Sequence, residues 1–333
     1  MTDPNKPTEV PLNQAVREPW RRFTEEFEAL RPDLYRYCRL LTRSPWDAED
    51  LVQDSLVRAF IILGTSMAPP EHPRAWLFRV ASNRWLNHVR RQREELVAEP
   101  PQAASPDVNP RAVREAGGSL VAQLAPKERA AVVLKEAFGF SLEETAAVLS
   151  TSVGAVKAAL HRGREKLKNV DTEPERTPCP AVLDEFCQAF NAHDLERLLA
   201  LLLDTTEVEL AGTFVGFGKE VARHALGGMM FAATQAVPAG IAEPHRGDLL
   251  FESPRFEAVT LRGTPLVLAY FRHESGDAVR SFSRLEWESA AADPEGAGDR
   301  ISRLRTYLHS PEALREICGE LKLPCRTNGY RNW

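Results

Sequence analysis

Basic side chains gather on one face of a short segment near the middle of this 333-residue chain. Five lysines and arginines lie between Ser152 and Val170 against one acid, Glu165, so the segment has a net charge of +4. Apolar residues from Val153 to Leu167 follow the 3–4 spacing of one buried helix face. A helix with an apolar back and a basic front fits the DNA major groove, where cations meet phosphates and base edges. The alternative is a solvated surface helix.

A DNA-binding helix must be held in place by neighbouring helices, and the residues just before this segment predict such a helix. Helical patterns over Leu142–Leu149 and Val153–Lys168 flank the tripeptide Ser150–Ser152, which is a helix-turn-helix layout. Ser141 and Glu144 have the spacing of a capping box, in which each side chain satisfies a backbone amide at the helix start. Together the two helices predict a DNA-binding module.

A second basic stretch lies upstream. His72–Arg93 holds six arginines and no acid, and Pro73 predicts the start of a helix. Trp76 and Trp85 lie among these cations, and aromatic residues next to cations suit contacts with the exposed bases of separated DNA strands. The alternative is that both tryptophans belong to a helical core.

An acidic helix precedes that stretch. Ser44 and Pro45 predict its start, and it extends over Asp47–Leu63. Its polar face begins with four acids, Asp47, Glu49, Asp50 and Asp54. This is more negative charge than the helix dipole requires. The face is therefore a candidate docking surface for a basic partner, with ordinary surface acidity as the alternative.

Composition describes an ordinary globular protein, with 43% hydrophobic and 27% charged residues. The net charge of −5 is unevenly spread, so the basic segments and not the total indicate the partner. The five cysteines are scattered and odd in number, which predicts no disulfide framework or metal site and favours the cytoplasm. We expect no signal peptide and no membrane partner, because the apolar run Leu198–Leu203 is too short to span a bilayer.

Shifts in composition predict the organisation of the chain. We expect a disordered tail (1–18), a helical module (19–96), a proline-rich linker (97–117), the helix-turn-helix module (118–171), a short linker (172–178), an α+β domain (179–309) and a tail (310–333) with a helix over Pro311–Leu321. Two DNA-binding modules on one tether raise each other's effective concentration. This arrangement predicts recognition of two separated DNA elements.

The α+β domain is expected to start with helices and end with strands. The predicted strands are Thr206–Ala211, Arg255–Arg262, Pro265–His273, Ala278–Glu288 and Arg300–Leu308. This order predicts helices on one face of a curved, largely antiparallel sheet.

No catalytic set stands out in this domain. His193 and Asp194 lie at a turn between two helices, where Asp194 is expected to cap the second helix. Arg303, Arg305 and Tyr307 alternate along one strand and either line a pocket or face solvent.

Three segments in this order resemble the extracytoplasmic-function (ECF) group of bacterial RNA polymerase sigma factors. They are DAEDLVQDSLVRAF (Asp47–Phe60), similar to region 2.2; PRAWLFRVASNRWLNHVRR (Pro73–Arg91), similar to regions 2.3 and 2.4; and Leu124–Leu167, similar to region 4. The resemblance covers about half the chain. It implies a transcription initiation factor with core RNA polymerase and promoter DNA as partners and no cofactor.

The resemblance also implies roles for residues at matching positions. Docking on the coiled coil of the polymerase β′ subunit is implied for Asp47, Glu49, Asp50, Leu51, Gln53 and Asp54. Contact with the opening −10 element is implied for Asn83, Arg84, His88, Arg90 and Arg91. Contact with the −35 element is implied for Lys135, Glu143, Ser152, Val153, Gly154, Lys157, Ala158, His161 and Arg162. The β flap of the polymerase is expected as a further partner surface. The chain departs from the family at Lys157–Ala159, which holds fewer donors than is usual and leaves the promoter sequence open.

The segment FNAHDLERLLALL, from Phe190 to Leu202, resembles the start of the SnoaL-like group of the NTF2-like fold. The fold class expected is therefore two all-α sigma modules, regions 2 and 4, followed by an α+β NTF2-like cone. The resemblance implies that this domain regulates the sigma modules in cis, and a small-molecule ligand is possible there.

We thus predict a sigma factor without catalysis of its own. Two alternatives stay open. An NTF2-like isomerase or cyclase with a DNA-binding module would need a pocket with a perturbed Asp or His. A helix-turn-helix repressor would have no need of the acidic face over Asp47–Asp54.

Overall fold

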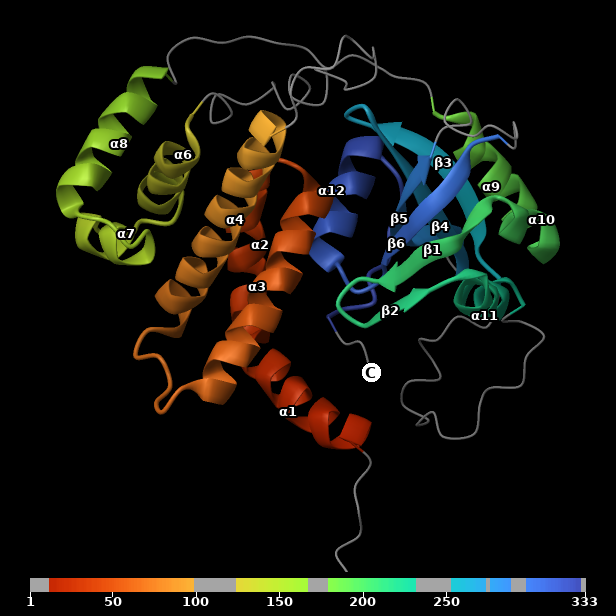
Figure 1. The fold of residues 1–333 in the computed structure, drawn as a ribbon, viewed down its shortest axis with the longest axis horizontal. Helices are drawn as coiled ribbons and strands as arrows, with labels where there is room; N and C mark the ends of the chain where they lie inside the picture. The colour runs from red at the N-terminus through yellow and green to blue at the C-terminus, as the bar shows by residue number, and fades with distance from the viewer. Residues whose placement is uncertain are drawn as a thin grey trace, which may run out of the picture. The chain divides into compact units, whose positions relative to one another are not determined.

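The computed structural model describes residues 12–98, 124–166, 179–231, 253–273, 276–288 and 298–330. They belong to two compact units, a helical unit from residues 12–98 and 124–166, and a C-terminal unit from residues 179–330 (Figure 1). Most of the linker predicted over residues 97–117, and all of that over 172–178, lie outside the described residues.

The first part of the helical unit is a group of helices that pack against one another. Its elements are α1 (Leu12–Phe27), a short 3-10 turn (Glu28–Leu30), α2 (Arg31–Thr42), α3 (Pro45–Thr65) and α4 (Pro73–Ala98). The hydroxyl of Ser44 accepts a hydrogen bond from the Asp47 amide at 3.1 Å, which confirms the predicted start of α3. Pro32 lies in the first turn of α2, where a missing amide proton does no harm.

Helix α1 begins earlier than expected. The prediction of a disordered tail is wrong for residues 12–18, which are helical. Glu18 forms ion pairs with Arg21 and Arg22, each at 2.9 Å, one turn further on. Trp20 packs edge-on against Phe60 of α3 with ring centroids 5.1 Å apart. This tertiary contact stabilises a segment whose polar composition alone favours disorder.

The second part of the unit is the predicted helix-turn-helix. It consists of α6 (Pro126–Val132), a π-helical turn (Val133–Ala137), α7 (Leu142–Val148) and α8 (Val153–Lys166). The capping box is confirmed, because Ser141 Oγ accepts from the Glu144 amide at 3.0 Å and Glu144 Oε2 accepts from the Ser141 amide at 2.7 Å. Gly163 lets α8 approach α6 closely, since a Cβ at this position would lie 2.7 Å from a methyl group of Val132.

The two parts pack against each other, which the expectation of separate tethered modules did not include. Phe138, after the π-helical turn, packs edge-on against Tyr37 of α2 and Phe78 of α4, with centroid distances of 5.7 and 5.1 Å. Arg129 of α6 donates to the carbonyl oxygen of Leu41 at the end of α2, at 2.7 Å. Burial lowers the pKa of Arg129. The helical unit therefore has a continuous interior across both parts.

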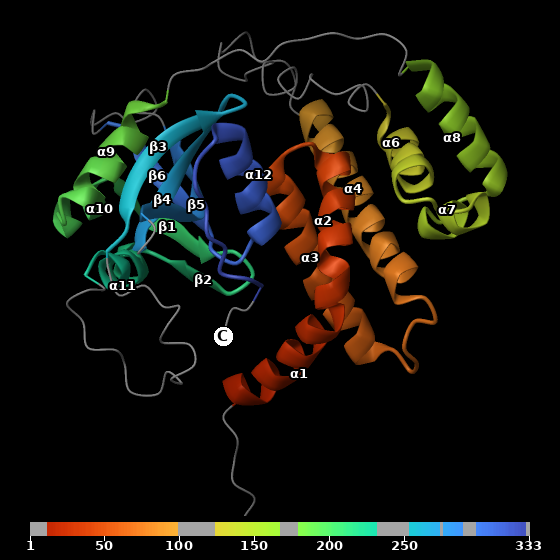
Figure 2. The ribbon, with the colours of Figure 1, turned by 180° about the vertical axis from the view of Figure 1, so that it is seen from behind.

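The C-terminal unit is a six-stranded sheet between helices (Figure 2). Its elements are α9 (Ala181–Asn191), α10 (Leu195–Ala200), β1 (Leu202–Leu210), β2 (Phe214–Phe217), α11 (Lys219–Met230), β3 (Arg255–Leu261), β4 (Thr264–His273), β5 (Gly276–Glu288), β6 (Arg300–Tyr307) and α12 (Pro311–Leu321). The strand order is β2-β1-β6-β5-β4-β3, in which only the pairing of β1 with β6 is parallel. The predicted meander of β3 to β6 is confirmed.

Two features of this unit differ from expectation. The edge strand β2 was not predicted, and β1 begins at Leu202, where the apolar run also suits a helix. In addition, helices cover both faces of the sheet, because α12 lies on the opposite side from α9 and α10 (Figures 1 and 2). The tail beyond α12 is held by Asn328, which donates to the carbonyl oxygens of Arg280 and Leu308 at 3.0 and 2.9 Å.

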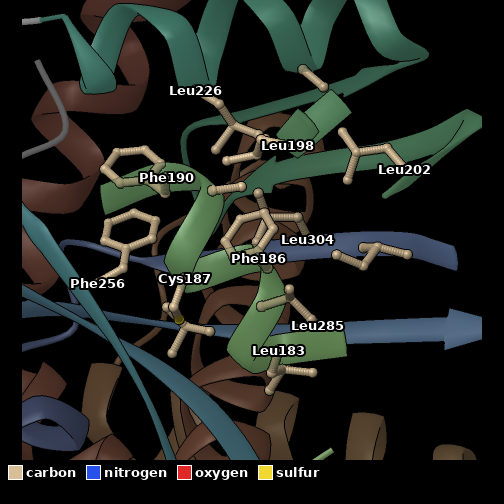
Figure 3. Close-up of a cluster of buried hydrophobic side chains, with 14 of the residues drawn as sticks. Leu183, Phe186, Cys187, Phe190, Leu198, Leu202, Leu226, Phe256, Leu285 and Leu304 are labelled. Atoms are coloured by element: carbon tan, nitrogen blue, oxygen red, sulfur yellow. The ribbon is translucent and has the colours of Figure 1, made fainter. Parts of the chain in front are cut away.

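The main core of the unit lies between the sheet and helices α9, α10 and α11 (Figure 3). Phe190 of α9 and Phe256 of β3 stack with centroids 3.7 Å apart and planes 6° from parallel. The side-chain amide of Asn191 closes the edge of this core, since it both donates to and accepts from the backbone of Phe256, at 2.8 and 2.7 Å. Helix α9 is thereby fixed to the first strand of the meander.

Cys187 lies inside this core, and its thiol predicts a pH dependence. Burial, with smaller contributions from Asp184 and Cys179, raises the pKa of the thiol from 9.0 to about 12. Between these values the unfolded chain releases a proton that the folded chain retains, so stability falls as pH rises, by up to about 1.4 kcal/mol per pH unit. Urea titrations at about pH 8 and about pH 10.5 measure the free energy of unfolding at each pH. The decrease in this free energy between the two pH values should be smaller for Cys187→Ala than for the wild type. An equal decrease in both proteins would contradict the attribution of this pH dependence to the Cys187 thiol.

Candidate nucleic-acid interface

Helix α8 presents most of the residues expected at the −35 element. Ser152, Gly154, Lys157, Ala158, His161 and Arg162 are exposed. Val153 is half-buried and packs on the core of the helix-turn-helix. Ser152 Oγ accepts from the Ala155 amide at 3.2 Å and caps the helix, whose exposed amino end is suited to a phosphate. Lys135, in the π-helical turn, is half-buried, and Glu143 of α7 is exposed.

Arg162 also has a partner within the protein. Its Nε donates to Glu128 at 2.7 Å, and the Glu128 side chain is only 7% exposed. The other oxygen of Glu128 accepts from the Ala125 amide at the start of α6, at 3.2 Å. The Arg162 side chain therefore ties α8 to α6. Lys157, one and a half turns earlier on α8, extends into solvent.

Helix α4 presents the residues expected at the −10 element. Asn83, Arg84, His88, Arg90 and Arg91 are all exposed. Trp85 is not, since it is 4% exposed and the Arg129 guanidinium lies 5.5 Å from its ring centroid. Of the two interpretations of the tryptophans, the core position is confirmed for Trp85. Trp76 is half-buried against Phe27, with ring centroids 6.1 Å apart.

The six residues of the acidic helix α3 that are expected to contact the polymerase differ in exposure. Asp47 and Asp54 are exposed and Asp50 is half-buried. Glu49, Leu51 and Gln53 are buried, so these three side chains do not belong to the exposed face. Glu49 is fully buried in an ion pair with Arg31 of α2, and Gln53 Nε2 donates to the same carboxylate at 2.8 Å. The exposed acidic face is therefore narrower than the sequence indicated.

Two apolar side chains that the sequence analysis did not single out extend this face. Val57 and Ile61 are 44% and 49% exposed. With Asp50 and Asp54 they follow the spacing 50, 54, 57, 61, which places all four on one side of α3. This helical spacing could have been found in the sequence, but both residues also fit an ordinary core pattern there.

The C-terminal unit uses its candidate residues for folding. Asp194 accepts from the Arg197 amide at 3.0 Å, which confirms the predicted cap of α10. Arg303 pairs with Glu207 and Glu209, each at 3.1 Å, and Arg305 pairs with Glu209 at 3.1 Å. The two arginines thus form a charge ladder across β1 and β6.

Two kinds of feature are absent from the described ranges, a metal-binding cluster and a membrane-spanning helix. They contain no cluster of histidine, cysteine or acidic side chains that could hold a metal ion. Within the same ranges no helix is both long and apolar enough for a membrane span.

Comparison with known proteins agrees with this geometry. Residues 27–95 match Sigma-70 region 2, and residues 118–167 match Sigma-70, region 4. The chain is 37% identical over 171 residues to the RNA polymerase sigma-E factor of Streptomyces avermitilis, a match that covers 47% of this chain and 95% of the relative. It is 34% identical over 146 residues to the ECF RNA polymerase sigma factor SigE of Mycolicibacterium smegmatis, covering 41% of this chain but only 56% of that relative.

The fold and the exposed basic helices thus define a protein with sigma regions 2 and 4. The chain belongs to the family of ECF RNA polymerase sigma factors. A crystal structure of the Mycobacterium tuberculosis ECF sigma factor SigJ aligns over 87% of this chain and 97% of its own, with 20% identity and a TM-score of 0.30. The expected fold class is confirmed at the level of the elements described, helical sigma regions followed by an α+β unit with a six-stranded sheet.

Proposed function

We propose that this chain binds core RNA polymerase, recognises the −35 and −10 elements of a promoter and starts transcription. The observation that carries the proposal is the pair of exposed basic surfaces, on α4 and α8, in the two sigma regions of one chain. Cations on two helices suit two separated contacts with one duplex, where phosphate binding positions the protein and base contacts provide specificity.

Each surface has a role in this proposal. Asn83, Arg84, His88, Arg90 and Arg91 contact the −10 element, and the exposed residues of α8 with Lys135 and Glu143 contact the −35 element. Asp47, Asp50 and Asp54 dock on the β′ coiled coil, and the helix-turn-helix part meets the β flap. Complementary charge at such a surface raises the rate and specificity of association.

The C-terminal unit is the regulatory part of the proposal. It acts in cis on the sigma regions and performs no catalysis, and the protein works in the cytoplasm, where the polymerase is. A small-molecule ligand could shift the balance between an inactive and an active state only by binding one of them better.

Transcription with purified components tests the proposal. Full-length protein mixed with core polymerase should co-purify with it and produce run-off transcripts from a template library with randomised −35 and −10 elements. A chain that ends at Asp171 should change the yield of these transcripts if the C-terminal unit regulates in cis. Identical yields would remove the regulatory claim, and a full-length chain that ignores core polymerase would overturn the function itself.

A further inference from the structure

One ion pair joins the two surfaces of sigma region 2 to which different partners are assigned. Arg84 of α4, from the surface proposed for the −10 element, is paired with Asp54 of α3, from the surface proposed for polymerase. The Arg84 and Asp54 side chains are 45% and 55% exposed, so both are accessible from solvent. The two helices pack directly against each other, which keeps the charged groups within reach.

The ion pair between the Asp54 carboxylate and the Arg84 guanidinium competes with the binding of each group to its proposed partner. A carboxylate that accepts from Arg84 offers less negative charge to a basic partner, and a guanidinium bound to Asp54 is less available to a phosphate. An exposed ion pair is worth little in water, so a stronger partner for either group can displace the other. By contrast, the buried Glu128 that holds Arg162 also caps α6, which makes that contact part of the fold.

We infer that the Asp54–Arg84 pair couples polymerase binding to binding of the −10 element. When a basic group of core polymerase binds Asp54, Arg84 is released toward DNA, and when DNA binds Arg84, Asp54 is released toward polymerase. Coupling of this kind is reciprocal, so each partner raises the affinity for the other by the same factor. The inference rests on the proposed function and adds Arg84 as a positioning residue for polymerase binding, through Asp54.

The decisive variant is Arg84→Gln, measured against core polymerase without DNA. A residue that only contacts DNA would not change this affinity, whereas loss of the pair should strengthen core binding by about 1.4- to 5-fold, the range typical of exposed pairs. The matched control is Arg79→Gln, which removes the same charge from another exposed position of the same helix, five residues before Arg84. Equal core affinities for Arg84→Gln, Arg79→Gln and the wild type would overturn the inference.

The reciprocal variant is Asp54→Asn, measured against a single-stranded −10 oligonucleotide without polymerase. Its affinity should rise by a similar factor of about 1.4 to 5, because Arg84 is no longer held. The exchanged pair Asp54→Arg with Arg84→Asp should lose both partners, which shows that the positions and not only the pairing matter. A wild-type chain that fails to bind core polymerase would overturn the proposed function together with the coupling, so the two failures are distinguishable.

Discussion

Replacing Glu49 with alanine should lower the free energy of unfolding of the helical unit by about 3–5 kcal/mol. The side chain is fully buried and accepts from both Arg31 and Gln53. Its removal leaves a guanidinium in the interior without its carboxylate, and an uncompensated buried charge is among the most destabilising changes known in a protein. Chemical denaturation followed by circular dichroism would measure the loss.

Two further variants separate a structural role of Glu49 from a docking role. Asp47→Ala removes an exposed acid from the first turn of the same helix, and should reduce stability by less than about 1 kcal/mol. The triple replacement of Arg31, Glu49 and Gln53 by methionine removes all three members of this hydrogen-bonded group together, and should recover most of the stability lost in the single variant. If Glu49→Ala is as stable as Asp47→Ala, the buried pair contributes nothing and the residue is open to a docking role again.

The sequence predicts local structure well where capping residues mark a helix start. Ser44 and Ser141 each accept the amide hydrogen bond that their spacing predicts, and α12 has the bounds expected from Pro311. Strand β2 is missed because four residues with a central Gly216 give no readable alternation. The parallel pairing of β1 with β6 joins residues 96 to 99 positions apart, such as Glu207 with Arg303 and Leu202 with Ile301, and no local pattern contains such a contact.

The details of the candidate site that could not be predicted from the sequence also depend on contacts between residues far apart in the chain. The acidic face of α3 is visible as a run of carboxylates, but which of them is neutralised depends on Arg31, eighteen residues upstream on another helix. Likewise the cations of α4 and α8 are evident from composition, whereas the Arg84–Asp54 and Arg162–Glu128 pairs arise from packing between helices. Residue type identifies the surfaces, and tertiary contacts decide which side chains on them are available.

Replacing Phe138 with alanine should separate the two parts of the helical unit. The ring is 8% exposed, contacts Tyr37 and Phe78 edge-on, and lies 4.9 Å from the guanidinium of Arg36. Truncation of a buried phenylalanine to alanine lowers the free energy of unfolding by about 3–5 kcal/mol, and part of this loss comes from the aromatic pairs. The helix-turn-helix part keeps its own cluster around Val156 and Leu160, so the loss falls mainly on the contact between the parts.

Energy transfer between labels at the exposed Met67 and Thr151 would report this opening. The control is Phe60→Ala, an aromatic truncation beside Trp20 within the first part, which should lower stability without changing the label distance. In the proposed function the closed contact must be broken whenever promoter geometry requires the basic helices further apart, so its strength opposes DNA binding. Phe138→Ala should then bind promoter DNA with polymerase more tightly than the wild type. An unchanged label distance in Phe138→Ala would show that other contacts, such as Arg129 with Leu41, hold the two parts together without it.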